Sequence, residues 1–312
     1  MKEIIIPFAV GISIFLFGMQ IMKLGLNNLA AHKLKEILTR FTKTPSHGFL
    51  TGTVLTMLLQ SSSAVTVITI GLTNARLLTF PQTIGIILGT NIGTTVTTQI
   101  IALDIYQYAV PLFLFGAFLW LIPYHILRCT GLAIAGFGCI FLGMDAMQTI
   151  VHPFRETGIF RELVVWGSEN SVVGVLIGTA ISAVIQSSSA TTAITMSFMG
   201  DHLIPLTMAI AIVLGSNIGT CMTALIAAIG GNTASVRVAW SHIILNVAGV
   251  VAFIPLISLL ALISTSLTAH PPAQVAHAQT IFNVVCSLVV LPFAHLFARL
   301  VEYLIPEKKP YT

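Results

Sequence analysis

The tetrapeptide QSSS occupies residues 60–63 and occurs again at residues 186–189, 126 positions further along the chain. Around the two copies, residues 48–103 align with residues 174–229 without a gap, and about 24 of the 56 aligned pairs are identical. A repeat at a constant offset indicates a duplicated structural unit. We call the two copies the first and second QSSS motifs.

A second motif recurs at the same offset, as GTNIGT in residues 89–94 and GSNIGT in residues 215–220. We call these the NIGT motifs. Upstream, FGM at residues 17–19 resembles LGM at residues 142–144, at an offset of 125. The duplication therefore extends beyond the QSSS segments.

The composition predicts an all-α integral membrane protein. Of 312 residues, 56% are hydrophobic and 8% are charged, whereas a soluble domain carries about 25% charged residues. The apolar runs are continuous rather than alternating, which favours helices over an outer-membrane barrel. We expect one membrane transport domain, residues 1–312, made of repeat 1 (1–128) and repeat 2 (129–312).

The apolar segments and the charges between them predict a multi-pass topology. Loop 30–47 carries four basic residues and one acidic residue and should be cytoplasmic. The net charge of +4 lies in the loops, and we expect no nucleic-acid partner. The apolar segments lie near 4–29, 48–74, 82–102, 108–127, 131–150, 171–199, 203–229, 237–265 and 276–305, with polar connections at 30–47, 151–170 and 266–275.

Segments 48–74 and 171–199 each place a QSSS motif near mid-segment. A full crossing would put the motif near mid-membrane, and a re-entrant hairpin would put its tip there. Hairpins make the two repeats inverted, whereas full crossings make them parallel. The charge bias does not distinguish the two topologies. By analogy with transporters whose broken helices meet at the midplane, we expect inverted repeats, each with a broken-helix hairpin, and about six full crossings.

The QSSS motif offers groups for both an anion and a cation. A helix that is broken there exposes amide donors at the start of its second half, and Ser is a favoured N-cap residue. The serine hydroxyls, together with carbonyls freed at the end of the first half, can coordinate a small hard cation. Two converging copies would enclose a site.

The aligned segments hold little positive charge. Arg76 is the only Lys or Arg in residues 48–103, and residues 174–229 have none. An anion bound there would lack an Arg clamp, so coupling to a cation is physically natural. Small polar residues are also common in helix packing, but two motif pairs in register favour a functional site. Asp145, an acid within an apolar segment, is a charge-coupling candidate.

At these motifs the sequence resembles the type II sodium–phosphate cotransporter family, in which paired QSSS stretches are each followed by Gly-x-Asn-Ile-Gly-Thr. The resemblance implies sodium-coupled symport of inorganic phosphate, an inverted-repeat fold, Na⁺ as coupling ion and no other cofactor. The implied substrate-binding residues are Gln60, Ser61, Ser62, Ser63, Gln186, Ser187, Ser188, Ser189, Asn91 and Asn217. The sodium candidates are Gln60, Ser63, Thr66, Thr94, Gln186, Ser189, Thr192 and Thr220.

The sequence departs from the family in two places. We expect no C-terminal regulatory domain of the kind that many bacterial relatives carry, and loop 151–170 is short compared with animal relatives. The short loops favour a bacterial plasma (inner) membrane. The motif chemistry also fits another small anion, such as a carboxylate or phosphate ester. A membrane enzyme acting on phosphorylated lipids, or a passive channel, is a weaker alternative.

Overall fold

The computed structural model describes residues 2–30, 34–103, 105–148, 158–200 and 203–307, and every regular element in these ranges is a helix. The first repeat and the start of the second comprise α1 (Lys2–Ala30), α2 (Leu34–Phe41), α3 (Pro45–Leu59), α4 (Ser62–Asn74), α5 (Phe80–Ile101), η2 (Tyr106–Tyr108), α6 (Ala109–Leu121) and α7 (His125–Gln148). The remainder comprises α9 (Gly158–Glu169), α10 (Ser171–Ile185), α11 (Ser188–Gly200), α12 (Leu206–Gly219), α13 (Met222–Ala228), α14 (Thr233–Phe253), η3 (Ile254–Leu256), α15 (Ile257–Leu267), α16 (Pro271–Val290), η4 (Leu291–Phe293) and α17 (Ala294–Leu304).

Within the described ranges, six helical stretches are long and apolar enough to cross a membrane, in agreement with the expected number. The predicted segment near 108–127 instead forms a shorter apolar stretch, Tyr106–Leu121. The six stretches are Ile6–Leu29, Phe80–Ile101, His125–Gln148, Leu206–Ala228, Thr233–Leu267 and Pro271–Leu304.

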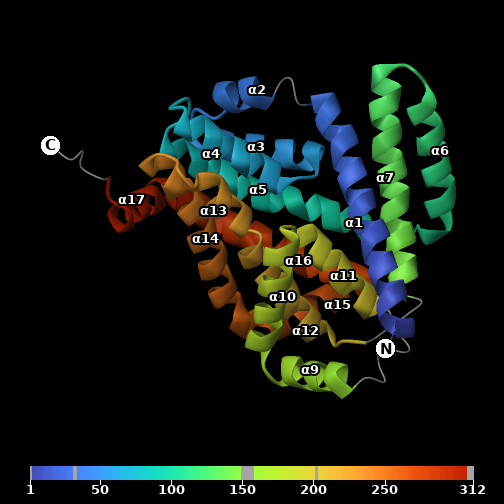
Figure 1. Ribbon diagram of the computed structural model, residues 1–312. Helices are drawn as coiled ribbons and strands as arrows, with labels where there is room; N and C mark the ends of the chain where they lie inside the picture. The colour runs from blue at the N-terminus through green and yellow to red at the C-terminus, as the bar shows by residue number, and fades with distance from the viewer. Residues whose placement is uncertain (1, 31–33, 104, 149–157, 201–202, 308–312) are drawn as a thin grey trace.

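Helices α1 and α7 pack side by side and antiparallel, with α6 on the outer side of α7 (Figure 1). Glycines allow the two backbones to touch. A Cβ added at Gly18 would lie 2.7 Å from the Gly136 carbonyl oxygen, and one at Gly25 would lie 2.4 Å from the Cys129 carbonyl oxygen. Residue numbers of the contacts rise along α1 while they fall along α7, so the two helices run in opposite directions.

Helices α3 and α5 also touch through glycine, but they run parallel. A Cβ at Gly85 would lie 1.9 Å from the Pro45 carbonyl oxygen, and one at Gly89 would lie 2.1 Å from the Phe49 carbonyl oxygen. Both numbers rise together along the pair. The chain must therefore return through α4 before α5 starts, so the first QSSS segment does not continue as one straight helix.

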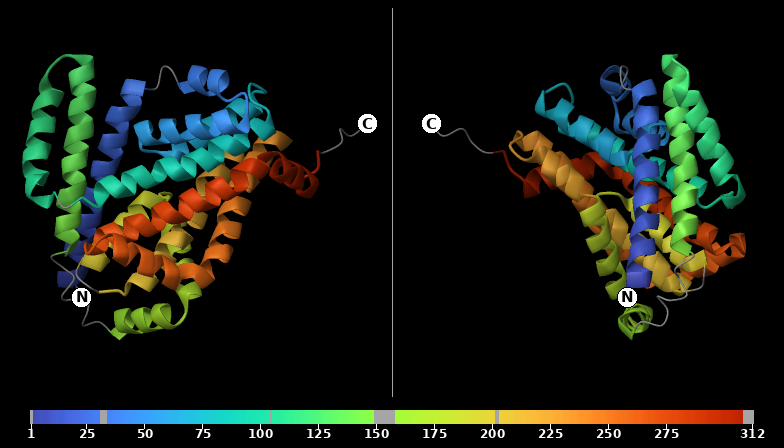
Figure 2. Two further views of the ribbon diagram at one scale, coloured as in Figure 1. Left: turned by 180° about the vertical axis from the view of Figure 1, so that it is seen from behind. Right: turned by 45° about the vertical axis from the view of Figure 1, so that its right-hand side comes forward.

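The second half repeats this arrangement with α10 and α12. A Cβ at Gly215 would lie 2.0 Å from the Val175 carbonyl oxygen, the position equivalent to Phe49. Helix α16 lies along α5 across the middle of the molecule (Figure 2), where the Ser287 hydroxyl donates to the Leu88 carbonyl at 3.1 Å. The two halves are thus held together through a shared centre.

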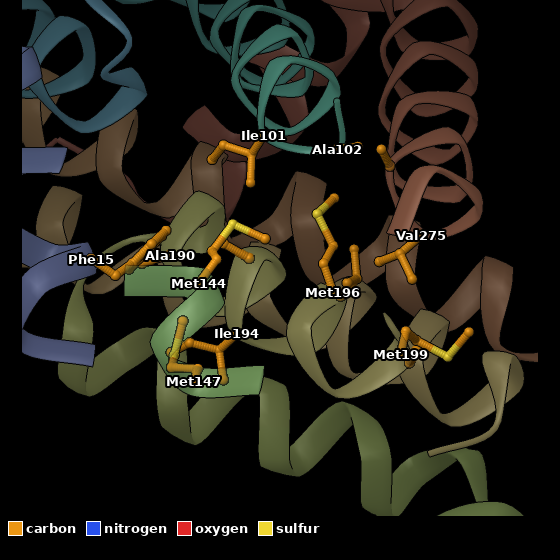
Figure 3. Close-up of a cluster of buried hydrophobic side chains, with 14 of the residues drawn as sticks. Phe15, Ile101, Ala102, Met144, Met147, Ala190, Ile194, Met196, Met199 and Val275 are labelled. Carbon is orange, nitrogen blue, oxygen red and sulfur yellow. The ribbon is translucent and has the colours of Figure 1, made fainter. Parts of the chain in front are cut away.

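One apolar core joins α1, α7, α11, α12 and α16 (Figure 3). Phe15, Met144, Ile194, Met196 and Val275 meet there, and each is at least 93% buried. This core fixes the face that α1 turns toward the second repeat.

The polar connections 30–47 and 151–170 contain helices that the hydropathy pattern alone does not show. In α2, Leu34 and Leu38 share one buried face, while Lys35 and Arg40 are exposed. Spacing by four places both leucines on one side of a helix. Helix α9 similarly occupies the end of the second connection.

Candidate substrate-binding site

The two QSSS motifs adopt the same local structure, a helix break at the glutamine. Helix α3 ends before Gln60, whose φ and ψ are 53° and 31°, and α10 ends before Gln186, at 58° and 31°. This left-handed conformation is uncommon for a residue other than glycine. A costly conformation that recurs at equivalent positions of both repeats is a candidate functional feature.

The helix that follows each break, α4 in the first repeat and α11 in the second, starts within the QSSS motif. The Ser61 hydroxyl accepts a hydrogen bond from the Ala64 amide at 3.2 Å, and the Ser187 hydroxyl accepts one from the Ala190 amide at 3.3 Å. These are N-cap contacts, as the serine content predicts. An α-helix leaves the other amides of its first turn without intrahelical partners. The first turns of α4 and α11 therefore offer backbone donors together with the helix dipole.

Both motifs line one cavity of about 590 Å³. Every residue of the two QSSS motifs contributes, so α3, α4, α10 and α11 meet there. Helices α1, α5 and α13 and the end of α12 complete the wall. The lining residues are Phe17, Gln20, Ile21, Lys23, Leu24, Asn27, Gln60, Ser61, Ser62, Ser63, Thr94, Thr97, Ile185, Gln186, Ser187, Ser188, Ser189, Thr220 and Thr223.

The repeats contribute matched threonines to this cavity. Thr94 and Thr220 are equivalent positions of the NIGT motifs, and both line the wall as their spacing suggests. The sequence interpretation missed Thr97 and Thr223, which also line it. Thr97 and Thr223 align at the same offset of 126 and lie one helical turn after Thr94 and Thr220. That spacing places each of them on the same helical face as the first threonine, and it could have predicted their position.

Direct contacts hold the two halves of the site together. The Thr223 hydroxyl of the second repeat donates to the Ser63 hydroxyl of the first at 3.4 Å. The Gln60 side-chain amide donates to the Met57 carbonyl at 2.6 Å. Because that bond uses the side-chain nitrogen, the side-chain oxygen of Gln60 can accept a hydrogen bond or coordinate a cation in the cavity.

Helix α1 lines one side of the cavity, whereas α7, its equivalent in the second repeat, contributes no described lining residue. Helix α1 contributes Gln20, Lys23 and Asn27, none of which belongs to a QSSS or NIGT motif. Helix α1 lies outside the aligned ranges 48–103 and 174–229, so the scarcity of basic residues in those ranges does not apply to it. Lys23 was detectable in the sequence as the only charged residue of apolar segment 4–29, because ionisable residues within membrane segments are functional candidates by default.

The structure places Asn91 and Asn217 outside this cavity. The Asn91 side-chain amide donates to the Asn246 side-chain oxygen at 3.4 Å, and that of Asn217 donates to the Val213 carbonyl of its own helix at 2.9 Å. Their part in substrate binding stays a prediction. In the structure Asn91 joins α5 to α14, Asn217 bonds within α12, and neither residue lines the cavity.

Thr66 and Thr192 lie one turn beyond the motif serines in α4 and α11. They are 1% and 0% exposed, and neither hydroxyl has a hydrogen-bond partner among the described residues. A buried hydroxyl without a partner is costly. Both repeats leave the same hydroxyl without a partner, but neither threonine lines the cavity, so their part in binding Na⁺ stays a prediction.

Asp145 does not reach the cavity. It is exposed on α7, three residues before the helix ends at Gln148. Gln20, its equivalent in the first repeat, does line the cavity. The predicted role of Asp145 in charge coupling therefore receives no support from position, and remains a prediction.

Comparison with known proteins identifies relatives over nearly the whole chain. The family model described as Na⁺/Pi-cotransporter matches residues 14–149 and 156–269. An uncharacterized protein of Bacillus subtilis, YqeW, is 38% identical over 305 residues, covering 98% of this chain and 99% of its own. No solved structure matches significantly.

Two further relatives carry functional names. The putative inorganic phosphate export protein YjbB of Salmonella typhimurium is 23% identical over 299 residues, covering 95% of this chain. The chain spans only 55% of that protein's length. The rabbit sodium-dependent phosphate transport protein 2A is 33% identical over 132 residues, which cover 36% of this chain and 20% of its own.

Proposed function

This chain belongs to the Na⁺/Pi-cotransporter family, and from that membership we propose that it carries inorganic phosphate and Na⁺ together across a bacterial plasma membrane. The family and its phosphate-transporting relatives support phosphate as the substrate. The observation that carries the proposal is that both QSSS motifs line a single cavity.

Phosphate fits the donors of this cavity. Its oxygens would accept hydrogen bonds from the serine hydroxyls and from the first-turn amides of α4 and α11. The two helix starts approach the same space, so one tetrahedral anion could contact both repeats. Backbone amides and hydroxyls bind an anion without the rigid geometry of an arginine fork.

Sodium would be held close to the phosphate by oxygen atoms. The unpaired hydroxyls of Thr66 and Thr192 are one source, and carbonyls at the ends of α3 and α10 are another. A hard cation prefers such ligands. Each bound Na⁺ lowers the energy of an anion in a low-dielectric site, and the reverse holds equally. That reciprocity is the physical basis of coupling.

We further propose that the repeats are inverted and that each QSSS segment is a re-entrant hairpin. Two arrangements support this topology. Helices α1 and α7, which hold equivalent places in the repeats, pack antiparallel. Helices α3 and α5 run parallel with α4 returning between them, and α10, α11 and α12 are arranged alike. Inverted repeats suit alternating access, in which one half moves against the other around a fixed site.

Relatives named as exporters and as sodium-dependent transporters need not differ in mechanism. A symport cycle runs in whichever direction the combined gradients favour. We propose that the Na⁺ gradient sets the direction here. Phosphate is carried unchanged, and no bond to phosphorus is broken.

The test is uptake of labelled phosphate into proteoliposomes that contain the purified protein. An inward Na⁺ gradient should accelerate uptake, and the same gradient of K⁺ or choline should not. Reversing the Na⁺ gradient in preloaded vesicles should drive efflux. Equal uptake with every cation would refute sodium coupling. Displacement of labelled phosphate by a carboxylate or a phosphate ester at lower concentration than by phosphate itself would assign a different anion.

A further inference from the structure

We propose that Lys23 supplies the positive charge that holds the anion between the two QSSS motifs, and that this charge favours a doubly charged tetrahedral oxyanion over a singly charged anion. The inference rests on the proposed function, since it takes the cavity as the phosphate site. It assigns a binding and selectivity role to a residue outside both motifs.

The packing of α1 directs one stripe of that helix at the cavity. Gln20, Lys23, Leu24 and Asn27 line it, and their spacing of three, four and seven places them on one helical face. Two other faces are already occupied. Glycines on one face contact α7, and Phe15, Met19 and Met22 on another lie in the apolar core. Lys23 is therefore held at the cavity by the fold.

No described acidic side chain neutralises Lys23. The ion pairs in the described part of the chain are Arg40–Glu36 and Arg237–Glu302, both elsewhere. The other described residues of the cavity wall are hydroxyl, amide or apolar. A lysine among membrane helices is costly unless a counter-charge or water offsets it. A bound anion is the counter-charge that this cavity is built to receive.

The charge is present in one repeat only. The position 125 residues after Lys23 is Gln148, whose side-chain amide donates to the Tyr106 hydroxyl at 3.3 Å, away from the cavity. The site is thus nearly symmetric in hydroxyls and asymmetric in charge. With a dianion bound, one lysine leaves one negative charge, which a co-bound Na⁺ would neutralise.

The experiment compares K23Q, K23R and wild type in proteoliposomes, with K35Q as the matched control because Lys35 is exposed on α2. We expect K23Q to raise the KM for phosphate about tenfold to a hundredfold, the worth of a charge-assisted hydrogen bond, with a smaller effect on the maximal rate. K23R should restore most of the affinity, and K35Q should match wild type. In K23Q, sulfate should lose more potency as a competitor than nitrate does, because a dianion gains more from one positive charge than a monoanion does.

A second measurement needs no variant. Saturating phosphate should slow acylation of the Lys23 amine in the wild-type protein, measured by mass spectrometry, while acylation of Lys35 stays unchanged. Wild-type KM in K23Q, or no protection by phosphate in a wild type that transports it, would overturn the role of Lys23 and leave the proposed function intact. A wild type that neither binds nor moves phosphate would overturn both. If K23Q does not fold, the protection experiment decides.

Discussion

The left-handed conformation of the glutamine at each helix break predicts that a glycine there lowers phosphate transport while it leaves the stability nearly unchanged. At Gln60 the φ of 53° imposes a steric penalty of about 1–2 kcal/mol on any residue with a Cβ. Gln60→Gly removes that penalty. It also removes the 2.6 Å hydrogen bond to the Met57 carbonyl, worth about 0.5–1.5 kcal/mol, and adds about 0.5–1 kcal/mol of backbone entropy cost. The terms nearly cancel, so Q60G should unfold within about 1 kcal/mol of wild type.

Gln60→Ala is the matched comparison. It loses the same hydrogen bond but keeps the left-handed penalty, so Q60A should be about 1 kcal/mol less stable than Q60G. This order is the reverse of that in an ordinary helix, where alanine is the more stable residue. Both variants should lose at least about tenfold in phosphate uptake, since a hydrogen bond to a charged ligand is worth about 1.5–3 kcal/mol.

The assay is unfolding in detergent, followed by fluorescence at a fixed protein-to-detergent ratio, alongside proteoliposome uptake. The pair should behave alike at Gln186, whose φ is 58°. Q60A that is as stable as Q60G would refute the left-handed assignment. Q60G that transports at the wild-type rate would show that the Gln60 side chain is not used in the site.

Three further outcomes are expected. Ser62→Ala or Ser188→Ala should cut transport without changing the unfolding midpoint, and normal transport in both variants would sink the site assignment. Thr66→Val or Thr192→Val should leave the stability unchanged or slightly raised, because it removes a buried hydroxyl that has no partner. The same variants should need a higher Na⁺ concentration for half-maximal uptake. An unchanged Na⁺ titration would argue against these threonines as sodium ligands. Gly178→Ala should destabilise the protein by about 2 kcal/mol or more, since its Cβ would lie 1.9 Å from a carbonyl oxygen of α12, and an unfolding midpoint equal to wild type would contradict the close α10–α12 packing.

Much of the local structure was readable in advance. The duplication predicts two equivalent units, and serines inside an apolar segment predict a helix start with a hydroxyl cap. Ser61 and Ser187 make those caps. Such features depend on residues within one turn of each other, so sequence is enough to predict them.

Which residues line the cavity was harder to predict from the sequence. Asn91 and Thr94 lie three residues apart on α5, yet Thr94 lines the cavity and Asn91 bonds to Asn246. Their spacing allows both to share a face. Asn91 instead contacts Asn246 of α14, and no pattern within α5 indicates where that helix lies.

By itself the sequence determined that this protein is helical, lies in a membrane and carries two copies of one polar motif, because composition and repetition are properties of the chain. Only the tertiary structure decided that the two copies share one cavity and that α1 adds Lys23 to it. The reason is physical. Glycine contacts fix how each helix is rotated against its neighbour, and that rotation selects which side chains face the site.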